Sequence, residues 1–318
     1  ALHYYIKSGK FYKAINDTLN YGRTTLYKAG MLYDSGNYIE SEIEAISALR
    51  LLSKTNSTRL IYECYNMIAL SLEEQNNFNK ALEYYNLALD QLDKLEKEGQ
   101  PIQKVLNSRA SCRNNIGGVY EKKGQYPKAV STYLMALSTP NLRASKPQLY
   151  AMLLNNLGYA KMKSNNLAAV KQNLFEALHI RDSLHNIPGT ISSKLKIAEY
   201  YLTTKDSANA VKFLADSYKL SKEIESNHDI LRSLKLLSEA DAGNKAHYSQ
   251  LYIRVSDSLR NVERITRNKF ARIAYEADEI EEENELLNKR NTRIIIASGA
   301  GAFILLCLLG MYRLRSRT

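Results

Sequence analysis

The hydrophobic and polar positions of the chain repeat at intervals of about forty residues. Two stretches, 68–89 and 116–137, share one skeleton of small, large apolar and aromatic positions around a polar turn. In the second stretch the skeleton positions are Gly117, Tyr120, Tyr126, Ala129, Tyr133 and Ala136. Apolar residues three and four positions apart are typical of amphipathic helices. Each stretch is therefore predicted to form a helix–turn–helix unit.

This skeleton resembles the tetratricopeptide repeat (TPR), which places small residues at positions 8, 20 and 27 and aromatic residues at positions 17 and 24. Looser copies keep the same phase, with Gly30 and Gly158 as the small residue of position 8 in two of them. Position 20 falls at residues 14, 41, 81, 129, 170, 210 and 250. A helix pair of this kind cannot bury its apolar face alone, so successive pairs must stack. We expect an all-α TPR superhelical solenoid of about six to seven helix pairs over residues 1–250.

The resemblance implies a concave groove lined by the first helix of each pair, at positions 2, 5, 9 and 12. Position 5 is Asn66, Asn114 and Asn155 in three consecutive repeats, with Tyr27 in the copy before and Leu195 and Lys235 in the copies after. A carboxamide both donates and accepts hydrogen bonds, so solvent-facing asparagines at repeat spacing can bind the backbone of an extended peptide. Peptide-binding TPR domains with asparagine ladders are similar. The alternative is that three asparagines in an Asn-rich chain coincide and merely face water.

Other groove positions add candidates for contacts with a ligand. The full set of predicted ligand-binding residues is Asn66, Asn114, Asn155, Tyr27, Tyr159, Lys235 and Glu121. Ordinary surface or inter-repeat packing remains an equal alternative for the last four.

Beyond residue 250 the repeat pattern gives way to a heptad track. Apolar or asparagine residues step three and four positions apart from Phe270 to Ile294. Residues 251–292 are therefore predicted to form a juxtamembrane helix or coiled coil, which would make a homodimer through residues 270–294. The alternative is a single amphipathic helix that packs back on the last repeats.

The C-terminal segment predicts a membrane span. Nineteen residues from Ile294 to Tyr312 carry no charge, and Arg293 and Arg313 flank them. A helix of this length crosses the hydrocarbon layer. We assign residues 293–313 to a transmembrane helix and 314–318 to a basic tail in contact with membrane lipid. Three basic residues lie close to the span on each side, so charge does not decide its orientation.

The distribution of charge and the motifs of the sequence bear on whether the protein binds nucleic acid or is an enzyme. The chain has 44 Lys and Arg against 33 Asp and Glu, a formal charge of +11, but no focused basic stripe. We expect no nucleic-acid partner. No catalytic or metal-binding motif accompanies the five histidines, so we expect no enzyme activity, no cofactor and no metal. Equivalent helices of neighbouring repeats lie too far apart for a disulfide between Cys64 and Cys112.

The order of repeats, juxtamembrane helix (252–287) and single span is similar to bacterial membrane-anchored TPR regulators. That resemblance implies a periplasmic TPR sensor at the bacterial inner membrane that binds a peptide or protein and relays the event to a kinase or DNA-binding output. This sequence holds no such output. A static membrane-tethered adaptor is therefore the alternative, and the nucleotides downstream of residue 318 would separate the two.

Overall fold

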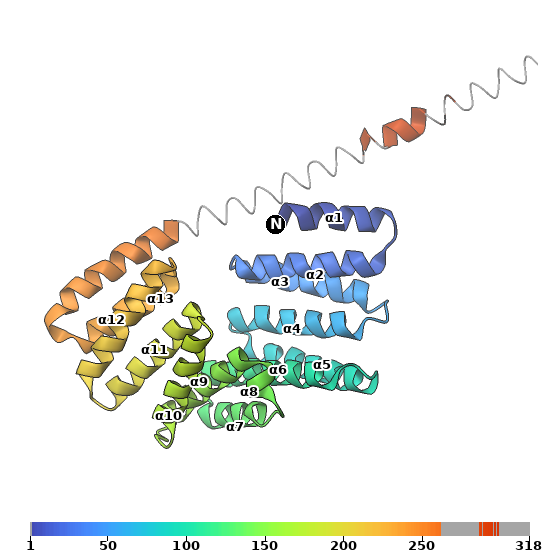
Figure 1. Ribbon diagram of the computed structural model, residues 1–318. Helices are drawn as coiled ribbons and strands as arrows, with labels where there is room; N and C mark the ends of the chain where they lie inside the picture. Colours follow the sequence, from blue (N-terminus) through green and yellow to red (C-terminus); the bar gives the residue numbers. More distant parts are fainter. Residues whose placement is uncertain (1, 262–285, 288, 295, 297, 299–318) are drawn as a thin grey trace, which may run out of the picture. The chain divides into compact units, whose positions relative to one another are not determined.

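The structure is a computed structural model that describes residues 2–261, 286–287, 289–294, 296 and 298. Within this part every regular element is a helix, so the expected all-α class is confirmed (Figure 1). The helices are α1 (Leu2–Ala14), α2 (Thr18–Asp34), α3 (Tyr38–Leu52), α4 (Thr58–Glu74), α5 (Phe78–Lys97), α6 (Ile102–Lys122), α7 (Tyr126–Leu137), α8 (Leu142–Ser145), α9 (Pro147–Lys163), α10 (Val170–Ser183), α11 (Ile187–Thr203), α12 (Ser207–Glu223) and α13 (Asn227–Ala240). A 3-10 turn, η1 (Ala242–Asn244), leads into helical residues 245–261.

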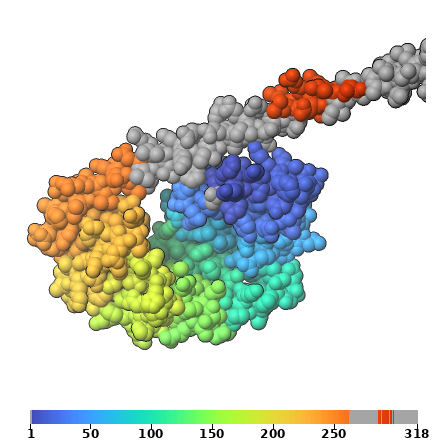
Figure 2. Space-filling model, turned by 45° about the horizontal axis from the view of Figure 1, so that its top comes forward, coloured from blue at the N-terminus to red at the C-terminus, as the bar shows by residue number. Residues whose placement is uncertain are grey.

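The helices stack as pairs along the chain. Five pairs, α2/α3, α4/α5, α6/α7, α9/α10 and α11/α12, each pack as a hairpin, and each pair also contacts the next. In addition, the first helices contact one another in succession, from α2 to α4, α6, α9, α11 and α13. A solenoid curves towards the side where equivalent helices approach most closely. The first helices therefore line its inner side, and Figure 2 shows the helices of this part winding around a hollow.

Local sequence chemistry starts and ends the helices. The first helix of each of the five pairs is followed within three residues by one with positive φ, a conformation that glycine and asparagine tolerate best, and the α9/α10 turn has a second one at Ala169. The five residues that follow the first helices are Gly36, Asn76, Gly124, Asn165 and Lys205. Asp17, Asn186 and Asp206 each accept a hydrogen bond from the backbone N–H three residues later, at 3.0, 3.0 and 3.1 Å, and so cap α2, α11 and α12.

The small residues at position 8 let paired helices approach closely. A Cβ on Gly117 would lie 2.3 Å from Cε1 of Tyr133, a fully buried ring on α7. A Cβ on Gly158 would lie 2.9 Å from Cδ2 of Leu174 on α10. The predicted small positions are thus contact points of the core.

The first complete repeat corrects the predicted register by one residue. From the sequence, Gly30 was the small residue of this copy, but the structure buries Ala29 completely and leaves Gly30 half-buried. The two small residues are adjacent, so the pattern alone did not separate them.

The chain divides into two compact units, residues 1–259 and 260–318. The predicted membrane span, 293–313, lies outside the described residues except at positions 293, 294, 296 and 298. Where the chain is described, none of the helices combines the length and the apolar character that a membrane crossing requires. The predicted coiled coil over 270–294 also lies mostly outside the described residues. Leu287 and Ile294, two of its described positions, are exposed.

Candidate functional site

The three predicted asparagines lie on consecutive first helices, but they are not equally exposed. Asn66 on α4 is half-buried, Asn114 on α6 is 8% exposed, and Asn155 on α9 is completely buried. The expectation that all three face solvent is therefore wrong for Asn114 and Asn155. Position 5 points towards the neighbouring helices, and the equivalent residues of flanking repeats, Leu26 and Leu195, are buried as well.

The next residue along each first helix completes a polar row. Asn115 on α6 donates from Nδ2 to Oδ1 of Asn66, at 3.4 Å, and Asn156 on α9 donates from Nδ2 to Oδ1 of Asn114, at 2.9 Å. Nδ2 of Asn114 lies 3.5 Å from Oδ1 of Asn115 and 3.4 Å from Sδ of Met152. We call the side chains of Asn66, Asn114, Asn115 and Asn156 the amide row. Side-chain hydrogen bonds of this row link three successive repeats.

A buried lysine ends the amide row on α11. Nζ of Lys196 donates to Oδ1 of Asn156 at 2.8 Å and lies 4.7 Å from the ring centroid of Tyr159. The Lys196 side chain is buried, and burial lowers its pKa to about 8, although the carboxylate of Glu121 partly opposes that shift. A cation over an aromatic face gains attraction from the ring. Lys196 is thus a buried amine held by an amide and a ring.

Charged groups surround this end of the row. Arg232 on α13 donates to Glu199 on α11 at 2.6 Å, and Lys163 on α9 lies 3.8 Å from the other oxygen of Glu199. The predicted residue Tyr159 is half-buried, and Nζ of Lys163 lies 5.2 Å from its ring centroid. Tyr159 therefore belongs to this end of the row.

Glu121 is held mainly by its own repeat. The hydroxyl of Tyr133 donates to Oε1 of Glu121 at 2.8 Å, and the same bond joins Tyr85 to Glu73 at 2.9 Å one repeat earlier. Burial raises the pKa of Glu121, while Lys196 and the Tyr133 hydroxyl oppose the shift. Glu121 therefore has two interactions: a structural hydrogen bond with Tyr133 and an electrostatic attraction to Lys196.

Tyr27 and Lys235, two of the predicted residues, lie outside both the amide row and its Lys196 end. Tyr27 is 43% exposed, and its ring contacts that of Tyr5 on α1 with centroids 5.8 Å apart. Lys235 on α13 is exposed, whereas its neighbour Leu234 is buried. Each lies one residue beyond the buried position of its helix.

Asn115, Asn156 and Lys196 did not appear among the predicted site residues. They occupy position 6 of three consecutive repeats, and the first two follow a predicted asparagine directly. The Asn-Asn doublets at 114–115 and 155–156 were therefore the signal that could have found Asn115 and Asn156.

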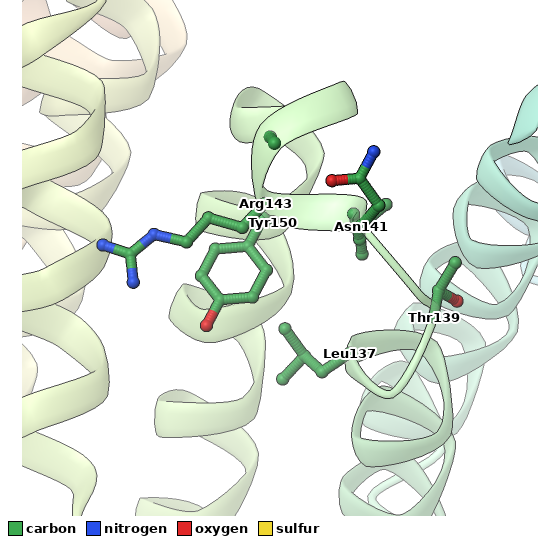
Figure 3. A pocket seen from close by; sticks show the side chains of 7 residues that line it. Leu137, Thr139, Asn141, Arg143 and Tyr150 are labelled. Atoms are coloured by element: carbon green, nitrogen blue, oxygen red, sulfur yellow. The ribbon is translucent and has the colours of Figure 1, made fainter.

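A separate pocket of about 550 Å³ lies between the end of α7, α8 and the start of α9 (Figure 3). The Arg143 side chain runs beside the ring of Tyr150, with the guanidinium 5.7 Å from the ring centroid, and it forms an ion pair with Glu176 at 3.3 Å. Leu137, Thr139 and Asn141 complete the labelled lining. The lining contains none of the predicted site residues, and its one cation is paired.

Comparison with known proteins bears on the fold. The tetratricopeptide repeat family model matches residues 62–91. A search of curated protein sequences finds no match. Several solved structures share the fold at low sequence identity.

The Rap conjugation gene regulator of plasmid pLS20, solved with the Phr* peptide, has a TM-score of 0.59 at 16% identity, over 83% of this chain and 71% of that one. The quorum sensor NprR of B. thuringiensis has a TM-score of 0.55 at 17% identity, over 80% and 76%. Aspartyl phosphate phosphatase F of Bacillus subtilis has a TM-score of 0.61 at 14% identity, over 74% and 61%. Since one neighbour is an enzyme by name, the absence of enzyme activity in this chain stays a prediction. The repeat match over residues 62–91 and the shared fold support the identification from the sequence: the described helices have the fold of a tetratricopeptide-repeat solenoid.

Proposed function

We propose that this protein is an interaction module that binds an extended peptide segment on the inner side of its solenoid, along α4, α6, α9 and α11. One observation carries the proposal: carboxamide groups from consecutive first helices form the continuous amide row. Carboxamides at regular spacing can satisfy the backbone groups of an extended chain without regard to its side chains. The peptide-bound Rap regulator, which shares this fold, supports the same class of ligand.

An affinity selection tests the proposal. A display library of random unstructured peptides is selected on the full chain, and the enriched peptides are measured by calorimetry. We expect the double substitution Asn66→Ala and Asn115→Ala to weaken their binding at least about tenfold, because each lost hydrogen bond contributes about 1 kcal/mol. Both side chains are half-buried, so the fold should survive, and circular dichroism checks this.

Asn86→Ala on α5 is the matched control, since Asn86 is an exposed asparagine on a second helix. It should leave the affinity unchanged. Failure to enrich any peptide, or equal affinity of the double variant and wild type, would contradict peptide binding at the amide row.

We also propose that residues 293–313 tether this module to a membrane, with a dimer through 270–294. The support is the uncharged run from 294 to 312 and the heptad track before it. Full-length protein should stay with the membrane pellet after alkaline carbonate extraction, whereas a chain ending at residue 290 should be released. Release of both chains would refute the tether. Relay of binding across the membrane, as opposed to a static adaptor, requires an output sequence downstream of residue 318.

A further inference from the structure

The hydrogen bonds between the side chains of the amide row all run in one direction. Lys196 donates to Asn156, and Asn156 donates to Asn114. Asn114 then faces Oδ1 of Asn115 with its amino group, and Asn115 donates to Asn66. Within the row, Asn156, Asn114 and Asn115 thus pass hydrogen bonds from the Lys196 end to Asn66, and the second donor contact of Asn114 goes to Sδ of Met152 on α9.

Lys196 is the residue that can fix this direction. An ammonium group has three donors and no acceptor, whereas a carboxamide can turn to present either its oxygen or its amino group. Asn156 must therefore turn its oxygen to Lys196, which leaves its amino group for Asn114. Asn114 must in turn present its oxygen to the amino group of Asn156. Neighbouring hydrogen bonds in a chain also strengthen one another.

We propose that Lys196 is a positioning residue that sets the hydrogen-bond direction of the amide row, so that Asn66 presents its amino group to carbonyl oxygens of a bound peptide. The assignment to a ligand rests on the proposed function, and it deepens that proposal by naming the atoms that meet.

The far end of the row agrees with this assignment. Oδ1 of Asn66 accepts the hydrogen bond from Asn115, and within the described part of the chain Nδ2 of Asn66 has no hydrogen-bond partner. Asn66 is also the least buried of the three position-5 asparagines. Its amino group is thus the group of the row that is available to an incoming acceptor.

The charge of Lys196 depends on the groups that face it. Glu121 on α6 and Glu199 on α11 favour the ammonium form, whereas burial, Arg232 on α13 and Arg181 on α10 disfavour it. Tyr159 on α9 covers it with the face of its ring, and Lys163 lies over the same ring. With a pKa of about 8, the amine is mostly protonated at neutral pH, where it only donates.

The first arm of the test needs no ligand. Full-length chain labelled with ¹⁵N at asparagine is observed by nuclear magnetic resonance, and solvent exchange of the side-chain amide protons is measured at neutral pH. Lys196→Met should speed exchange of the Asn156 and Asn114 amide protons by about tenfold. Lys163→Met is the control, because Lys163 lies over the same ring, has no contact with the row in the described structure, and should change nothing.

Asn156→Asp separates direction from mere packing. Aspartate still accepts from Lys196 but cannot donate to Asn114, so the Asn114 carboxamide should turn its amino group to the carboxylate, and exchange of the Asn114 amide protons should change while the fold and the Lys196 contact remain. Unchanged exchange at Asn114 in both Lys196→Met and Asn156→Asp would overturn the proposal.

The second arm uses a peptide enriched on the wild-type chain and three versions of residue 66. If Asn66 donates to a carbonyl, Asn66→Ala should weaken binding, and Asn66→Asp should weaken it at least a further threefold, because a carboxylate repels the carbonyl oxygen. Affinity of Asn66→Asp equal to or above that of Asn66→Ala would overturn the donor assignment. If no peptide is enriched, the proposed function fails, and the exchange experiment still decides the direction of the row.

Discussion

Two adjacent glycines on α6 differ in what surrounds them. A Cβ at Gly117 would lie 2.3 Å from the Tyr133 ring, whereas at Gly118 the nearest atom would be Oε1 of Glu73, at 3.8 Å. We predict that Gly117→Ala lowers the free energy of unfolding by about 1–3 kcal/mol, because Tyr133 is fully buried and cannot move aside. Gly118→Ala should be neutral or stabilising by up to about 1 kcal/mol, through helix propensity. Urea denaturation of the two variants measures both values, and equal effects would contradict the close contact.

Lys196 gives the fold a measurable dependence on pH. Burial lowers its pKa from the ordinary 10.5 to about 8, so between these values the unfolded chain binds more protons than the folded one. The free energy of unfolding must then rise with pH in this interval. Wild type should gain up to about 1 kcal/mol per pH unit over Lys196→Met above pH 8. Urea titrations at several pH values give the difference, which would stay constant if the amine kept its ordinary pKa.

The helix pairs show how far the repeat pattern can be read from sequence. Small and aromatic positions identified the pairs, because Gly117 and Tyr133 must meet for two helices to pack. The register was wrong where two small residues stand together, at Ala29 and Gly30. Consequently Tyr27 was assigned to a position that the structure gives to Leu26. Repeat spacing alone therefore assigns a position of the repeat to one residue only when its neighbours in the sequence do not match that position equally well.

The asparagines show a second limit. Their repeat spacing located the inner side of the solenoid, but side-chain burial depends on the helix of the next repeat, which packs against each position differently. Asn155 is therefore completely buried, while Asn66 at the same position is not. Lys196 could not be read as part of the row because, at the position of Asn115 and Asn156, its residue type differs from theirs.

Position 5 offers a matched pair of substitutions on α6 and α9. Among the residues that the structure describes, Oδ1 of Asn155 is buried without a hydrogen-bond partner, its Nδ2 donates to Oγ of Ser192 at 3.4 Å, and the equivalent residue of the next repeat is Leu195. Asn155→Leu removes an unsatisfied buried acceptor, so we expect stability equal to wild type or higher by about 1 kcal/mol. Asn114→Leu should cost about 1–3 kcal/mol, because it leaves Asn156 without its acceptor. Thermal denaturation compares the two, and a larger loss for Asn155→Leu would reverse the assignment.

Each helix of the solenoid contacts its neighbours in the chain or the next first helix. The free energy of unfolding of each described repeat should therefore depend mainly on that repeat and on the repeats next to it. Leu214 lies in the core formed by α11, α12 and α13, and Leu52 lies in the core formed by α2, α3 and α4. Both side chains are fully buried, and truncation of either to alanine should cost about 2–5 kcal/mol.

Hydrogen exchange should locate that loss. Leu214→Ala should speed amide exchange in α11 to α13 and leave α2 to α5 near wild-type rates, while Leu52→Ala should do the reverse, because openings in a repeat array are confined to the weakened neighbours. The amide row joins the two regions through single side-chain hydrogen bonds, which contribute about 1 kcal/mol each and are too weak to spread the opening. Equal acceleration along all described helices, in either variant, would instead show that the solenoid opens as one cooperative body and that the inter-repeat interfaces are stronger than the repeats.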